Sequence, residues 1–147
     1  MPQLTGMQRL RYIGTKTVVA QAMTRLAYNE LRGWTLPEDE NGADEGYLVE
    51  YTDGGKPNHP DFEGYISWSP KAQFDNAYCC ADTFLDRLRI EQHDLLTKLE
   101  GLQEFKSTPA FEGLSVTQRM LLTEQSNIMC SYFDILDLLI ADVIDRM

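Results

Sequence analysis

Arginines and aromatic side chains in the second half of the chain are the residues best suited to chemistry, and that chemistry is binding. Arg87 and Arg89 flank the first of two long predicted helices, and Arg119 falls in the first turn of the second. A guanidinium group clamps a phosphate with two parallel hydrogen bonds, and a helix N-terminus also favours anions. Phe105 and Phe111 can stack on a base. We therefore predict ligand binding by Arg87, Arg89, Phe105, Phe111 and Arg119.

Each candidate also has an ordinary structural interpretation. A single arginine is more often a solvated surface residue, and an aromatic side chain is more often part of a core than a stacking platform. The same choice applies to Tyr12, Trp34, Trp68 and Phe74. The binding prediction depends on the arginines sharing one neighbourhood, which only tertiary structure decides.

Catalytic and metal-binding patterns are absent from the sequence. His59 and His93 have no second histidine or cysteine at metal-ligand spacing, and there is no HExxH motif, nucleophile elbow or Walker loop. The carboxylates of residues 35–46 (TLPEDENGADEG) predict a solvated acidic loop, because so many like charges cannot pack together. We expect a binding protein that is not an enzyme and uses no cofactor or metal.

The charge and composition narrow the partners and the compartment. The formal net charge is -10, with acidic residues in excess in both halves, so duplex nucleic acid is not an expected partner. We find no membrane span and no apolar core of a signal peptide. Cys79, Cys80 and Cys130 are an odd number without a disulfide or zinc pattern. A cytoplasmic protein with reduced thiols is expected.

Dense glycine and proline in the first part of the chain predict a β-rich module. A short helix capped by Thr24 is expected to end at Gly33. Ser69 precedes Pro70, an arrangement favoured at a helix start. The predicted strands, of which the last two form an antiparallel hairpin, are residues 12–20, 47–51 and 64–68.

From residue 82 onward the apolar pattern has a helical period, which predicts two packed helices. The segment 107–115 contains a proline and a glycine that oppose helix continuation. Ser115 followed by Gln118 is a capping-box pattern that marks the second start. The apolar face of the first helix consists of Leu85, Leu88, Leu95, Leu99 and Leu102.

The second helix carries two parallel apolar lines, and together they are wider than one partner helix covers. We therefore expect a homo-oligomer. The first line is Leu121, Gln125, Ile128, Tyr132, Ile135, Leu139 and Val143; the second is Leu122, Met129, Leu136 and Val143. The predicted fold class is α+β: a small N-terminal antiparallel β-rich module over residues 1–80, then a C-terminal antiparallel α-helical hairpin over 81–147 for oligomerisation and ligand binding.

Two parts of the chain resemble phage proteins. The N-terminal part resembles the module of proteins related to the Thoeris anti-defence sponges, in the run YIGTK (12–16), MTRLAYNELRGW (23–34), DEGYLVEY (44–51) and GYISWSPKAQF (64–74). This module also precedes unrelated C-terminal parts, so it does not fix function by itself.

The second half resembles the helical hairpin shared by Thoeris anti-defence protein one and the anti-CBASS cyclic-nucleotide sponges. The matched positions are Glu91, Leu95, Lys98, Leu102, Phe105, Phe111, Leu114, Leu121, Leu122, Gln125, Met129 and Tyr132. Most of them are apolar helix positions. Together, the two matches favour the Thoeris anti-defence family.

This resemblance implies a phage sponge that sequesters nucleotide immune messengers in the infected host cell without cleaving them. The implied ligands are glycocyclic ADP-ribose and, at a separate site, small cyclic di- or trinucleotides; the implied assembly is commonly a hexamer. The family's ligand contacts are polar positions outside the matched motifs, so the five candidates named above are physical choices near matched positions.

Two other function classes stay open. An acidic interaction module could dock a host protein or mimic nucleic acid, and the charge of -10 favours it because that charge repels free nucleotides at long range. An enzyme acting on nucleotides is the weakest hypothesis, because no base, nucleophile or metal site is evident.

Overall fold

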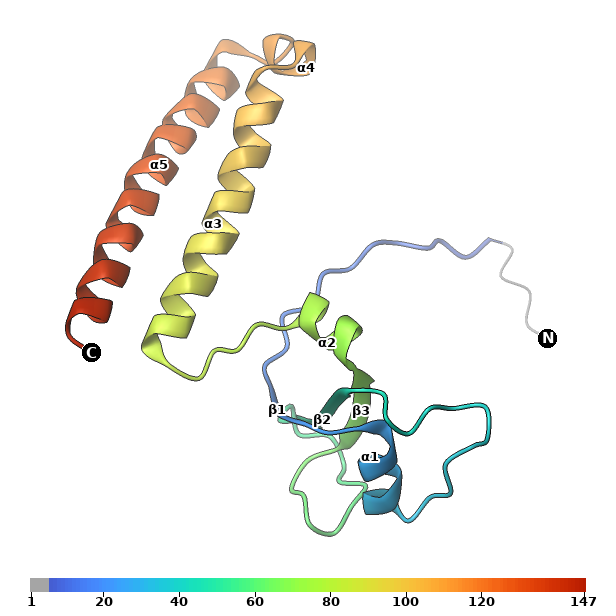
Figure 1. Cartoon of the computed structure of the whole chain (residues 1–147). Helices are drawn as coiled ribbons and strands as arrows, with labels where there is room; N and C mark the ends of the chain where they lie inside the picture. The colour runs from blue at the N-terminus through green and yellow to red at the C-terminus, as the bar shows by residue number, and fades with distance from the viewer. Residues whose placement is uncertain (1–5) are drawn as a thin grey trace. The chain divides into compact units, whose positions relative to one another are not determined.

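The computed structural model describes residues 6–147 and divides into two compact units that meet in sequence between Tyr78 and Cys79. The predicted α+β class, with antiparallel strands first and a helical hairpin after them, is confirmed (Figure 1). The elements are β1 (Val18–Ala22), α1 (Arg25–Arg32), β2 (Gly46–Tyr51), β3 (Ile66–Pro70), α2 (Lys71–Ala77), α3 (Phe84–Lys106), α4 (Pro109–Glu112) and α5 (Val116–Asp145).

The sheet of the first unit has the order β1-β2-β3 and is antiparallel throughout. The predicted pairing of the second and third strands is confirmed, but the predicted bounds of two strands are wrong. The first strand begins only at Val18, which pairs with Tyr51, the last residue of β2, so residues 12–17 have no strand opposite them. The third begins at Ile66, because the N–H of Gly64 donates to the Glu50 side chain instead of a strand backbone.

One face of the sheet holds the core of this unit. Leu48 of β2 and Ile66 of β3 are buried against Tyr28 of α1. Met23, Leu31, Phe62 and Trp68 pack around them. Burial of these apolar side chains is the main source of the module's stability.

The other face of the sheet carries an aromatic stack. Tyr47 of β2 stacks on Phe74 of α2 with ring centroids 4.2 Å apart, and Phe74 stacks on Tyr78 at 4.9 Å. The predicted cap of α2 by Ser69 is wrong. Ser69 pairs with Tyr47 inside β3, and α2 begins after Pro70 without a side-chain cap.

Helix α1 begins and ends as predicted. The Thr24 side chain accepts from the N–H of Ala27, and Gly33 ends the helix with a φ of 71°. The acidic side chains of the following loop are exposed, as predicted, but the loop is also bound to the helix. The N–H groups of Arg25 and Leu26 donate to backbone carbonyls of that loop, so its main chain satisfies the start of α1.

The second unit is a hairpin in which α3 and α5 pack antiparallel (Figure 1). Thr83 caps α3 in a reciprocal capping box with Asp86, and the Thr83 N–H that donates to this carboxylate lowers the pKa of Asp86. The predicted break contains the short helix α4. The Ser115 side chain accepts from the N–H of Gln118 where α5 begins, as the sequence indicated.

The hairpin buries one of the two apolar lines of α5. Leu136, on the second line, lies in the interface with Leu88 and Leu99 of α3. The first line stays exposed in the single chain, with Leu121 65% and Ile128 59% accessible to solvent. The predicted excess apolar width of α5 is therefore confirmed. Within the described residues, no helix has the length and apolarity needed to span a membrane.

Gly46 is expected to tolerate no side chain. A Cβ at Gly46 would lie 2.3 Å from the Ser69 carbonyl oxygen and 2.4 Å from the Trp68 ring. Gly46→Ala should lower the free energy of unfolding by about 1–3 kcal/mol, measured by urea unfolding followed by tryptophan fluorescence. Gly14→Ala is the control, because nothing lies within 4 Å of a Cβ there. Equal stability of the two variants would contradict this account.

Candidate functional site

The connected end of the helical hairpin contains a hollow of about 470 Å³. Two of the five predicted binding residues, Phe111 and Arg119, line it. Its full lining is Phe111, Val116, Arg119, Met120, Thr123 and Glu124. The lining residues therefore come from α4 and the first turns of α5, so the hollow lies wholly within one unit.

The turn after α3 positions the aromatic side of this hollow. Ser107 and Thr108 donate their hydroxyls to carbonyls of the last turn of α3, which ends that helix. Phe105 then meets Phe111 edge to face, with ring centroids 6.1 Å apart. Phe105 is not in the lining, so of the two predicted aromatic residues only Phe111 faces the hollow.

Arg119 provides the positive side of the hollow. It lies one turn into α5, where its own N–H donates to the carbonyl of Ser115. Its Nε atom is buried and has no hydrogen-bond partner among the described residues. A buried donor without a partner costs free energy, and the helix dipole at the start of α5 adds positive potential. This end of α5 is therefore suited to an anion.

A second cation lies close to the same end of the hairpin and was not among the predicted residues. Lys106 Nζ donates to Ser126 Oγ at 3.0 Å, and Ser126 is 1% exposed. Neither Lys106 nor Arg119 has a carboxylate within ion-pair distance in residues 6–147. Glu124, however, lines the hollow and opposes their charge. The sequence signal for Lys106 was its place in the last turn of α3.

Arg87 and Arg89 lie near the other end of α3. Phe105 is 18 residues beyond Arg87 on the same helix, which places their Cα atoms roughly 27 Å apart. The Arg87 guanidinium donates to the carbonyls of Ala81 and Asp82, and Arg89 is exposed. The structure thus brings together Phe105, Phe111 and Arg119, but not Arg87 and Arg89.

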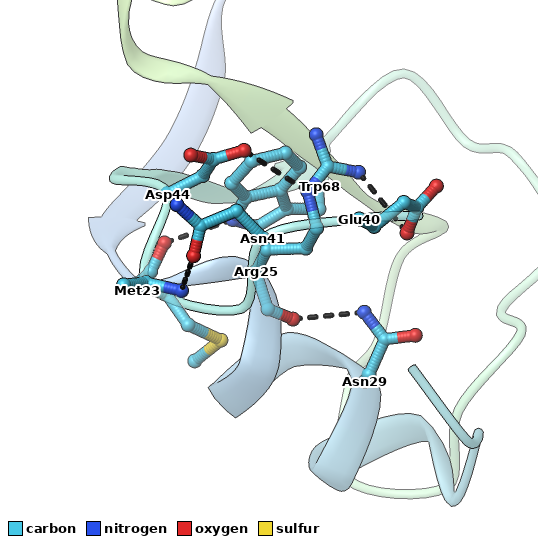
Figure 2. A network of polar contacts seen from close by, with 8 residues as sticks. Met23, Arg25, Asn29, Glu40, Asn41, Asp44 and Trp68 are labelled. Carbon is cyan, nitrogen blue, oxygen red and sulfur yellow. Dashed lines mark hydrogen bonds and ion pairs between the residues drawn. The ribbon is translucent and has the colours of Figure 1, made fainter. Parts of the chain in front are cut away.

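The N-terminal module contains a second group of arginine and aromatic side chains, centred on Arg25 (Figure 2). The guanidinium carbon of Arg25 lies 4.5 Å from the centroid of the Trp68 ring. Its nitrogens lie 3.5 Å from Glu40 and 3.6 Å from Asp44. Trp68 Nε1 in turn donates to the carbonyl of Met23 at 2.8 Å. This network ties the acidic loop, α1 and β3 together.

The other predicted aromatic and histidine residues are either packed or hydrogen-bonded within the N-terminal module or exposed to solvent. Trp68 and Phe74 are packed in the module, whereas Tyr12 is 84% exposed. The Nδ1 atom of His59 accepts from the N–H of Asp61, so its Nε2–H donates to the carbonyl of Leu31. No group of three or more potential metal ligands occurs in the part of the chain that the structure describes.

In the comparison with protein families, the model of the Sequestin family matches residues 82–138. The matched segment begins before α3 and contains every residue that lines the hairpin hollow, whereas the N-terminal module lies outside it. The match fits a protein that sequesters another molecule. No curated protein and no solved structure matches the chain significantly.

Arg25 should contribute to stability mainly through Trp68. Glu40 and Asp44 are partly exposed, so their ion pairs with Arg25 contribute little, while the planar guanidinium stacks on the indole ring. Arg25→Lys should therefore lower the free energy of unfolding by about 1 kcal/mol, measured by urea unfolding. Arg11→Lys, at an exposed position, is the control. An unchanged midpoint for Arg25→Lys would contradict this role.

Proposed function

We propose that this protein is a phage anti-defence sponge that binds and sequesters a nucleotide immune messenger in the host cytoplasm without cleaving it. The observation that carries the proposal is the hollow between Phe111 and Arg119, which lies inside the segment that matches the Sequestin family. The messengers we propose are glycocyclic ADP-ribose and, as a second class, cyclic di- or trinucleotides.

The chemistry of the hollow suits a nucleotide. A base can stack on the Phe111 ring, while a phosphate can accept from Arg119 and from free N–H groups at the start of α5. Lys106 adds positive charge nearby. The lining contains no histidine or cysteine, and its one carboxylate belongs to Glu124.

The magnitudes indicate that one copy supplies only part of a tight site. A nanomolar dissociation constant corresponds to about 12 kcal/mol. One stacked base contributes about 1–3 kcal/mol, and one charge-assisted hydrogen bond contributes about 1.5–3 kcal/mol. One aromatic ring and two cations therefore fall short. We infer that a second copy completes the site.

Isothermal titration calorimetry tests the messenger. We expect binding of a cyclic ADP-ribose isomer or of a cyclic di- or trinucleotide, and about tenfold or more weaker binding by Arg119→Gln, because the variant loses a charge-assisted contact. Arg146→Gln is the control, because Arg146 pairs with Asp142 at the far end of α5. No heat with any of these ligands would refute the proposal.

Recovery of the ligand separates a sponge from a hydrolase. After the complex is denatured, chromatography should return the intact messenger in the amount that was bound. A cleaved product would instead assign an enzymatic activity.

The exposed line of α5 is the surface through which we propose that copies assemble. Ile128, Ile135 and Leu139 lie along one side of the helix and remain exposed in the hairpin. A second copy offers the same line, so the contact can be self-complementary. Association through this line would remove apolar surface from water, and a hexamer is the assembly we propose.

Ile135→Glu should break this assembly. The side chain is 55% exposed, so the hairpin should keep its helicity while a buried carboxylate at the interface opposes association. Light scattering coupled to size-exclusion chromatography should show a smaller species for this variant. Asn127→Glu, an exposed polar position of α5, should leave the mass unchanged.

A protein-interaction module is the second candidate function. The same exposed apolar line, together with the net charge of -10, would also suit a host protein with a basic surface. A wild-type chain that is monomeric and binds none of the messengers would favour this candidate. A stoichiometric host protein recovered by pull-down would then identify the partner.

A further inference from the structure

The N-terminal module contains a hollow of about 530 Å³ that the hairpin proposal does not use. Arg25, Arg32, Trp34, Tyr65 and Trp68 are among its lining residues. We propose that this hollow is a separate binding site for a small molecule with a planar ring and one anionic group, either a carboxylate or a phosphate. The site lies entirely within the first unit and is independent of the messenger site.

Arg32 is the principal anion donor of this hollow. Its guanidinium carbon lies 4.3 Å from the centroid of the Trp34 ring, and its Nη1 donates to the Tyr28 hydroxyl at 2.9 Å. In residues 6–147 no carboxylate lies within ion-pair distance of it. An arginine has five N–H donors, so most of those on Arg32 remain for a ligand. Because the side chain is already held, binding costs little rotamer entropy.

Arg25 offers a second, weaker donor. Its Nε atom is buried and has no hydrogen-bond partner within residues 6–147, although an Asp44 carboxylate oxygen lies 3.6 Å from it. The distances to Glu40 and Asp44, 3.5 and 3.6 Å, exceed the roughly 2.7–2.9 Å of a strong charge-assisted hydrogen bond. These pairs therefore leave hydrogen-bonding capacity on Arg25 unused.

Exposed aromatic rings at the same hollow provide the surface for the planar part of the ligand. Trp34 is 53% exposed and Tyr65 is 47% exposed, although both belong to a module with its own core. Aromatic rings in such positions stack on other planar groups. Tyr28, by contrast, is buried and supports Arg32 from below the surface.

The charge balance selects a ligand with a single anionic group. Two arginines face two carboxylates, those of Glu40 and Asp44, so the site is close to neutral before a ligand binds. A polyanion would be repelled by these carboxylates and by the net charge of the chain. A cation would compete with Arg25 and Arg32 for indole rings that they already occupy.

The chain provides its own reporter for this site. It has only two tryptophans, Trp34 and Trp68, and both line the hollow. Intrinsic tryptophan fluorescence of the full chain therefore reports on this hollow and not on the hairpin. We would titrate 5′-AMP as the phosphate probe and benzoate as the carboxylate probe. Adenosine and benzamide are the matched uncharged controls.

We expect saturable fluorescence change with at least one of the two anions, and about tenfold or more weaker binding of its uncharged analogue. Response to 5′-AMP alone would identify a phosphate ligand, and response to benzoate alone would identify a carboxylate ligand. No saturable change with either anion, or equal affinity for the charged and uncharged members of a pair, would overturn the proposal.

Variants assign the response to Arg32. Arg32→Gln should weaken binding about tenfold to a hundredfold through the lost charge-assisted bonds, with folding checked by circular dichroism. Arg11→Gln, an exposed arginine, should bind as the wild type. If Arg32→Gln does not fold, Tyr65→Ala removes a half-exposed ring and should also weaken binding. Wild-type affinity in the folded variant would overturn the proposal.

Failure of this site and failure of the messenger site are separate results. Arg119→Gln should leave the fluorescence titration unchanged, since Arg119 belongs to the other unit. A protein that binds messenger by calorimetry but shows no fluorescence response would retain the proposed function and lose this inference.

Discussion

One α-helix can cover only one side of another, and the second unit of this protein follows from that limit. Helix α5 carries apolar side chains over more of its circumference than α3 can bury. The line through Leu136 is buried in the hairpin, while the line through Ile128 and Ile135 stays in water. Large exposed apolar surface is unfavourable in a solitary soluble chain. The hairpin by itself therefore leaves one apolar line of α5 uncovered.

The same packing sets the chemistry at the connected end of the hairpin. Leu88, Leu99 and Leu136 are buried in the hairpin, but near the turn the contact becomes polar, with Lys106 donating to the buried Ser126. There the buried Nε atom of Arg119 has no hydrogen-bond partner in the part of the chain that the structure describes. Buried polar groups are usually satisfied, and this unpartnered Nε atom lies at the hollow that Phe111 also lines, which is why we propose the ligand site there.

The N-terminal module depends on a different interaction, the close approach of β2 to Trp68. The absence of a side chain at Gly46 lets the indole ring lie against the strand, where it donates to Met23 and supports Arg25. The acidic loop is held over α1 by this arrangement and by its own carbonyls. Many of the residues involved belong to the motif run that resembles the phage module, which gives that run a physical basis in one packed network.

The two hollows use the same residue types within an acidic chain. Each pairs arginine with an aromatic ring, and each has a carboxylate at its margin: Glu124 in the hairpin and Glu40 in the module. Because the net charge of the chain is -10, its long-range electrostatic field repels anions. In the two sites that we propose, selectivity for an anion would come from short-range geometry.

The sequence by itself determined the fold class, the helical hairpin and the excess width of α5, because periodicity and capping are local properties. Thr24, Gly33 and Ser115 mark helix ends as expected. Strand bounds were less predictable, since Val18 joins the sheet only because Tyr51 lies opposite it. Ser69 lost its capping role for the same reason, because pairing with Tyr47 keeps it in β3.

Only the tertiary structure decided which candidate residues share a neighbourhood. Residue type alone predicted five binding residues. The length of α3 separates Arg87 from Phe105, whereas the turn brings Phe111 to Arg119. Arg25 and Arg32 were not among the predicted residues, and the fold places them against Trp68 and Trp34. Contacts between residues distant in sequence depend on how the elements pack, and no local pattern encodes that.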